Sequence, residues 1–97
     1  MFMRRVYDIF LDSLPSIDLH GFDRDTASIA TSDFILENVA LGNSKVVIIH
    51  GIGEGIVRSS VHQNLSKNKY VISYKQDNFN PGVTVVELNV DKRWQTC

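Results

Sequence analysis

The sequence has one cysteine, two prolines and no long uninterrupted apolar run, and each of these scarcities excludes a class of protein. Because Cys97 has no second cysteine to pair with, neither an internal disulfide framework nor a cysteine-rich zinc site is available. No stretch reaches the ~20 apolar residues of a membrane span, and the opening residues lack the pattern of a secretory signal. These absences predict a cytoplasmic protein in a reducing compartment, without membrane association.

Net charge is also small. Ten basic and eleven acidic residues leave a formal net charge of −1, unlike proteins that hold nucleic acid by overall charge alone. Any basic patch must therefore be local. The segment from Gly55 to Gln76 contains no acidic residue, and its four basic side chains are candidates for nucleic-acid contacts. They are Arg58, Lys67, Lys69 and Lys75.

The length and composition predict a single domain. A chain of 97 residues with 43% apolar content is long enough for one hydrophobic core and too short for two. Proline and glycine fall between short periodic segments, so they mark turns within that domain. We expect the domain to span residues 15–90, with an N-terminal extension at 1–14 and a C-terminal tail at 91–97. Residues 4–12 form an amphipathic segment whose type, helical or extended, stays open.

The apolar pattern predicts four strands and two helices. Strand patterns cover residues 17–20, 45–50, 70–75 and 83–88, and the second of these is apolar on both faces, as in a central and usually parallel strand. One helix is predicted from a cap at Asp23 or Asp25 to about Leu41, and another from Ile56 to about Lys67. The order predicts an α/β two-layer sandwich, in which a mixed four-stranded sheet carries both helices on one face.

The first predicted helix carries two apolar stripes. The stripe expected to face the sheet consists of Ala27, Ala30, Phe34 and Leu41. A second stripe lies almost opposite and consists of Ile29, Leu36 and Ala40. The N-terminal segment folding back, or a partner subunit as in a homodimer, would explain it equally well.

Three polar side chains are predicted to gather at one edge of the sheet. Asp18 and His20 are two residues apart in a strand pattern and therefore project from the same face. His50 ends the next strand, and the carboxyl ends of parallel strands share the edge where ligands bind. Asp18, His20 and His50 are therefore the candidate catalytic residues. His62 lies in mid-helix and is predicted to be a surface residue.

A glycine-rich connection, His50-Gly51-Ile52-Gly53-Glu54-Gly55, joins the second strand to the second helix. Glycines allow the backbone to approach an anion, and the N–H groups at the helix start attract one, so the loop predicts phosphate binding. The spacing matches neither the dinucleotide fingerprint nor the P-loop. Arg58, one turn into the helix, is placed to hold the same phosphate.

These two motifs resemble those of a known family, the Smr (small MutS-related) domain. Its hallmarks are a Leu-Asp-Leu-His-Gly strand end and a His-Gly-x-Gly-x-Gly loop. The matching segments here are Ile17-Asp18-Leu19-His20-Gly21 and His50-Gly51-Ile52-Gly53-Glu54-Gly55. The similarity continues through the second helix to the closing Gly82-Val83-Thr84-Val85-Val86-Glu87-Leu88 and covers residues 15–90.

The resemblance implies an endonuclease acting on DNA or RNA, with a sheet similar to that of the C-terminal domain of bacterial translation initiation factor three. The residues that it assigns to the active site are Asp18, His20 and His50. Those that it assigns to phosphate contact are Gly51, Gly53, Gly55 and Arg58. Many members carry Lys or Arg where this chain has Ile52, and Thr where it has Glu54, so the loop loses a positive charge and gains a negative one.

One aspartate and two histidines favour general acid–base chemistry, in which one imidazole takes a proton and the other gives one. RNA suits this chemistry best because its 2′-hydroxyl is an internal nucleophile. No cofactor is therefore predicted, although nicking of DNA would call for a divalent cation, with Asp18, Glu54 or Asp77 as ligands. The alternative function is a non-catalytic module that binds nucleic acid or the ribosome, which the near-neutral charge and Glu54 favour.

Overall fold

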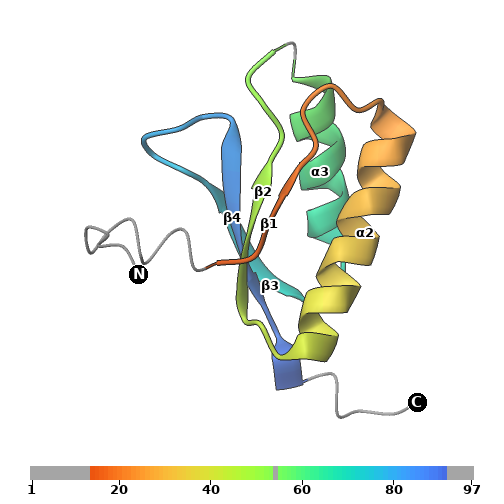
Figure 1. Cartoon of the computed structure of the whole chain (residues 1–97), viewed down its shortest axis with the longest axis vertical. Coiled ribbons are helices and arrows are strands. Elements are labelled where there is room, and N and C mark those ends of the chain that lie inside the picture. Colours follow the sequence, from red (N-terminus) through yellow and green to blue (C-terminus); the bar gives the residue numbers. More distant parts are fainter. Residues whose placement is uncertain (1–13, 54, 92–97) are drawn as a thin grey trace, which may run out of the picture.

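The computed structural model describes residues 14–53 and 55–91, which form one four-stranded sheet with two helices against it (Figure 1). The strands are β1 (Ser16–Asp18), β2 (Lys45–Ile49), β3 (Val71–Gln76) and β4 (Val83–Leu88), and the helices are α2 (Arg24–Leu41) and α3 (Ile56–Lys67). This arrangement confirms the predicted α/β sandwich. The segment at residues 4–12, Glu54 and Cys97 lie outside the described residues. No helix in the described ranges has the length and apolar character needed to cross a membrane.

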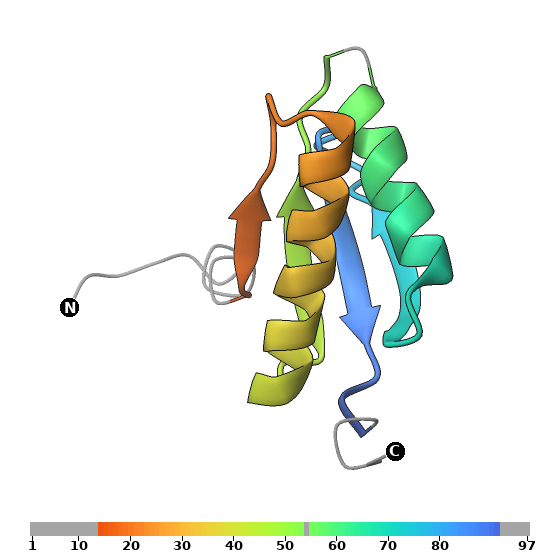
Figure 2. The ribbon, with the colours of Figure 1, turned by 90° about the vertical axis from the view of Figure 1, so that its right-hand side faces the viewer.

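The strand order in the sheet is β1-β2-β4-β3 (Figure 2). β1 and β2 are parallel, whereas β4 is antiparallel to both of its neighbours, β2 and β3. The last strand of the chain therefore lies between two earlier ones. β2 is central, as its apolar sequence predicts, but it has a parallel neighbour on only one side.

Local sequence signals account for the ends of α2. The carboxylate of Asp23 accepts a hydrogen bond of 2.8 Å from the backbone N–H of Thr26, which satisfies one of the free donors in the first turn. Gly42 ends the helix in the left-handed conformation, with φ of 83°, which glycine adopts without steric cost. The helix therefore begins after one of the two predicted caps and ends at Leu41, as the sequence predicts.

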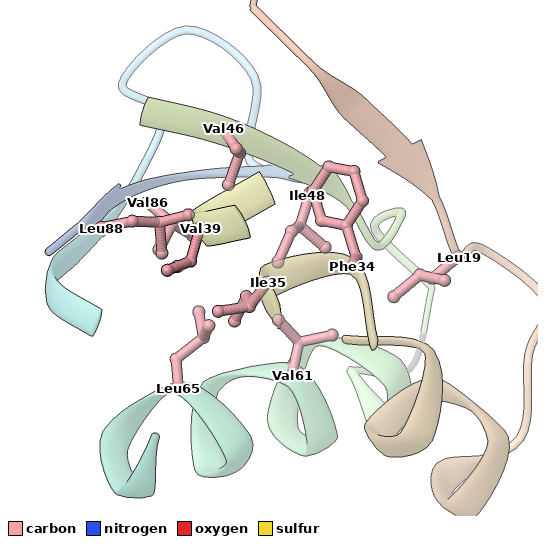
Figure 3. Packing of buried hydrophobic residues seen from close by; sticks show 10 residues of the cluster. All are labelled: Leu19, Phe34, Ile35, Val39, Val46, Ile48, Val61, Leu65, Val86 and Leu88. Carbon is pink, nitrogen blue, oxygen red and sulfur yellow. The ribbon is translucent and has the colours of Figure 1, made fainter. Parts of the chain in front are cut away.

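The core lies between the helix pair and one face of the sheet (Figure 3). Its fully buried members include Leu19 after β1, Ile35 and Val39 on α2, Ile48 on β2 and Val61 on α3. The two helices also contact through polar groups, because the hydroxyl of Ser60 donates to the carbonyl oxygen of Arg24 at 2.8 Å. This bond ties the first turn of α2 to the first half of α3.

The predicted core stripe of α2 is only partly right. Ala27 and Phe34 are buried, but Leu41 is 68% exposed. Thr31 and Asn38 take part in the buried face instead, because their side chains donate to carbonyl oxygens one turn earlier, at 2.7 and 2.8 Å. A search for apolar residues alone misses polar side chains that are buried because they bond to carbonyl oxygens of their own helix. The second stripe is exposed along the helix, at Ile29, Leu36 and Ala40.

Candidate functional site

Two connections lie side by side at one end of the molecule (Figures 1 and 2): β1 to α2, and β2 to α3. Between them is a hollow of about 460 Å³, lined by residues 20–24 and by the described residues of 50–58. Because β1 and β2 are parallel, the carboxyl ends of both strands and the amino ends of both helices face this hollow. The site is therefore built by the two sequence motifs together.

Asp18 and His20 form a hydrogen-bonded pair at the end of β1. The Nδ1 atom of His20 lies 2.8 Å from Oδ1 of Asp18, which also accepts the backbone N–H of His20 at 3.1 Å. The hydrogen bond from the His20 ring is the main cause that lowers the pKa of Asp18, so the carboxylate stays ionised. An ionised carboxylate only accepts, so Nδ1 carries the hydrogen. The Nε2 atom has no hydrogen-bond partner among the described residues, and the side chain is 71% exposed.

His50 reaches the same end of the sheet, but its ring is held inside. The residue is only 3% exposed, on the face of β2 that packs against the helices. Its Nδ1 atom lies 3.0 Å from the carbonyl oxygen of Gly51, and its Nε2 atom lies 2.8 Å from the hydroxyl of Thr84. Both ring nitrogens thus have partners within the protein. His50 differs in this respect from the freely available second histidine that the sequence suggests.

The three loop glycines are not equivalent. The N–H of Gly51 donates to the carbonyl oxygen of Gly82 at 3.1 Å, so it is not available to a phosphate. A Cβ atom on Gly51 would lie 3.0 Å from the Cβ of His20, so this glycine lets the two motifs touch. By contrast, no described residue accepts the N–H of Gly53 or Gly55. These two amides, with those of the first turn of α3, are the candidates for contact with an anion.

Of the four basic residues predicted to contact nucleic acid, only Arg58 lies beside the hollow. Its guanidinium is near Gly55, where an added Cβ would approach Nη2 to 3.6 Å, and its Nη1 is 3.5 Å from the side-chain oxygen of Gln76. Lys67 ends α3 nine residues later, about 14 Å away at 1.5 Å per residue. Lys69 follows the helix, and Lys75 pairs with Val85 on the sheet face opposite the helices.

The sequence reasoning missed two residues that line the hollow. Arg24 begins α2, where a positive charge opposes the helix dipole, and that unfavourable placement is a signal that could have identified it. Phe22, which lines the hollow together with His20, is 39% exposed, and an exposed aromatic ring there suits the stacking of a base. The site therefore combines two cations with an apolar rim.

His62 was also misjudged as a surface residue. It is half-buried, its Nε2 atom lies 2.8 Å from the hydroxyl of Thr84, and its ring is 5.7 Å from that of His50 and 5.3 Å from that of Tyr74. Burial is the first cause that lowers the pKa of His50 and of His62 below the ordinary value of 6.5. Both imidazoles are therefore neutral in the folded protein near neutral pH.

This burial predicts a stability that falls in mild acid. Below pH 6.5 the unfolded chain binds protons at His50 and His62 that the folded chain does not yet bind, so the free energy of unfolding decreases as pH falls. Above pH 6.5 the full free energy of unfolding is restored. Urea unfolding at pH 7.5, 6.5 and 5.5 measures the effect. His62→Gln is expected to flatten the pH dependence, whereas His20→Gln, at an exposed position paired with Asp18, is the control that should not flatten it. An equal slope in all three proteins would contradict the assignment.

Comparison with known proteins places this geometry in a family. The sequence profile of the Smr domain matches residues 17–89. The crystal structure of the Smr domain of Thermus thermophilus MutS2 superimposes with a TM-score of 0.74 at 31% identity, covering 77% of this chain and 98% of that domain. YdaL, a stand-alone small MutS-related protein from Escherichia coli, superimposes with a TM-score of 0.72 at 27% identity, over 91% of this chain and 77% of that one. The chain belongs to the Smr domain family.

Curated relatives extend the comparison to whole proteins. Endonuclease MutS2 from Clostridium acetobutylicum is 42% identical over 76 residues, and Endonuclease MutS2 from Clostridium novyi is 37% identical over 76 residues. Each alignment covers 75% of this chain but only 10% of the relative. The similarity therefore concerns one domain of those much longer proteins.

Proposed function

We propose that this protein is an endonuclease of the Smr type that cuts single-stranded RNA by general acid–base chemistry. The observation that carries the proposal is the Asp18–His20 pair, whose exposed histidine lines the same hollow as the glycine loop and Arg58. The relatives named as endonucleases support it. DNA is the second substrate to be tested.

In this proposal Nε2 of His20 accepts the proton of the 2′-hydroxyl as the 2′-oxygen bonds to phosphorus and the bond to the 5′-oxygen breaks. Asp18 keeps the imidazole in the required tautomer and stabilises its charged form. Arg58 and the free amides of the loop stabilise the charge on the pentacoordinate phosphate. The leaving 5′-oxygen takes its proton from water. The products are a cyclic phosphate and a 5′-hydroxyl.

One observation favours a second candidate, a nucleic-acid-binding or ribosome-binding module without turnover. The partners of both His50 nitrogens leave one free histidine in the hollow, where a two-histidine mechanism needs two. In the part of the chain that the structure covers, no three His, Cys, Asp or Glu side chains come together as a metal site requires. Asp77, a possible ligand in the metal mechanism, instead accepts the N–H of Phe79.

The deciding experiment incubates the protein with end-labelled single-stranded RNA, hairpin RNA and supercoiled DNA, each with and without chelator and divalent cations. The proposal predicts cleavage of RNA that persists in chelator and leaves a cyclic phosphate. Products with a 5′-phosphate, together with complete loss of activity in chelator, would replace it by metal-dependent hydrolysis. Binding without cleavage under every condition would favour the second candidate.

Phosphate contact makes a separate prediction about salt. If Arg58 neutralises one phosphate, Arg58→Gln should reduce the dependence of log affinity on log salt by about 0.7 for a single strand. Lys67→Gln is the matched control, since Lys67 lies at the other end of α3. Fluorescence anisotropy with a labelled oligonucleotide between 50 and about 200 mM salt measures both slopes. If the salt dependence fell equally in the two variants, the nucleic acid would contact α3 along its whole length.

A further inference from the structure

A chain of hydrogen bonds runs from α3 through the sheet to the glycine loop. His62 on α3 and His50 after β2 both place Nε2 at 2.8 Å from the same hydroxyl, that of Thr84 on β4. On its other side, His50 places Nδ1 at 3.0 Å from the carbonyl oxygen of Gly51. Thr84 is fully buried and His50 nearly so, and water does not compete for these bonds.

The chemistry of the donors gives the chain one direction. A carbonyl oxygen only accepts, so Nδ1 of His50 carries the hydrogen, and in the neutral ring Nε2 is then an acceptor. The single hydroxyl hydrogen of Thr84 must satisfy that acceptor, and its oxygen in turn accepts a hydrogen from Nε2 of His62. Each group has the one tautomer or rotamer that its neighbour requires.

We propose that His62 and Thr84 are positioning residues that hold His50, and through it the Gly51 carbonyl, in the conformation that presents the glycine loop to phosphate. This inference rests on the proposed function of the loop. The order of donation is His62 to Thr84, Thr84 to His50, and His50 to Gly51. His50 therefore shapes the site and transfers no proton to the substrate, which leaves that task to His20.

A second set of hydrogen bonds fixes the backbone on either side of Gly51. The N–H groups of His50 and Gly51 both donate to the carbonyl oxygen of Gly82, at 2.9 and 3.1 Å. The backbone of Gly82 thus holds the N–H of the His50–Gly51 peptide, and the His50 ring holds the carbonyl oxygen of the next peptide, Gly51–Ile52. Gly82 and Thr84 belong to one short stretch at the start of β4, so this strand positions both sides of the loop. Rotation of the Gly51–Ile52 peptide would change the direction of the chain that leads to Gly53.

The test compares Thr84→Val, which keeps the shape of the side chain without its hydroxyl, with Thr84→Ser, which keeps the hydroxyl. We expect Thr84→Val to bind a single-stranded RNA oligonucleotide about 10-fold to 100-fold more weakly, since displacements of about 1 Å cost rates and affinities of that order. Thr84→Ser should stay within about threefold of the unaltered protein. His62→Phe should also weaken RNA binding, but by less than Thr84→Val does. His62→Gln, which keeps a hydrogen-bond donor, is its control.

Nitrogen NMR of the histidine rings reads the proposed chain directly and independently of any activity. In the unaltered protein at pH 7.5, His50 should show its hydrogen on Nδ1, and His62 on Nε2. Thr84→Val should change both ring signals and shift the backbone amides of Gly53 and Gly55, and Thr84→Ser should restore them. A hydrogen on Nε2 of His50 in the unaltered protein would overturn the inference, even if Thr84→Val fails to fold.

The two proposals fail in different ways. If the unaltered protein neither binds nor cuts nucleic acid while the ring tautomers are as stated, the proposed function is wrong and the positioning chain stands. If Thr84→Val binds RNA as well as Thr84→Ser does, with unchanged loop amides, the positioning role is wrong whatever the activity.

Discussion

Replacing His20 with alanine is expected to reduce the rate of RNA cleavage by about 100-fold to 10,000-fold, the usual contribution of a general base. The free Nε2 of this ring is the proton acceptor in the proposed mechanism, and the residue is exposed, so its loss removes chemistry without removing core packing. Affinity for RNA should change by less than about threefold. Single-turnover cleavage measures the rate, and anisotropy with a substrate lacking the reactive 2′-hydroxyl measures the affinity.

Asp18→Asn and Asp77→Asn provide the matched comparison. Asp18→Asn removes the negative charge that holds the His20 ring, and we expect a fall in rate that approaches the loss in His20→Ala. Asp77→Asn changes a carboxylate in the turn before β4 and should leave the rate near that of the unaltered protein. If Asp77→Asn lost activity and His20→Ala kept it, the catalytic group would lie elsewhere and a metal mechanism would be favoured.

Gly51→Ala is expected to lower the free energy of unfolding by about 2–5 kcal/mol. The left-handed conformation, with φ of 82°, costs about 1–2 kcal/mol for a residue with a Cβ. That Cβ would also lie 3.0 Å from the Cβ of His20, and forcing such a contact costs a further ~1–3 kcal/mol. Urea unfolding at pH 7.5 measures the loss.

Gly21→Ala separates these two contributions. Gly21 has nearly the same φ, 84°, but nothing lies within 4 Å of an added Cβ, so only the conformational cost of about 1–2 kcal/mol is expected. A difference between the two variants then reports the contact between Gly51 and His20, by which the two motifs touch. Equal losses in the two proteins would mean that His20 moves aside freely.

The sequence by itself determined the elements, the fold class and half of the geometry of the candidate site. The strand and helix patterns, the cap at Asp23 and the stop at Gly42 are local signals, and the structure agrees with them. The pairing of Asp18 with His20 is local, because the two residues are only two positions apart where β1 ends, so no distant residue was needed to predict that they act together. The two motifs also carried the resemblance to the Smr domain, which the comparisons confirm.

Only the tertiary structure decided what depends on residues far apart in the chain. β4 lies between β2 and β3, and this places Thr84 beside His50, 34 residues away, and beside His62, 22 residues away. The direction of the His50 ring and the hidden role of His62 follow from that placement. Periodicity tells which residues of one element share a face, but it carries no information on which element that face meets, because the partner is selected by packing of the whole core.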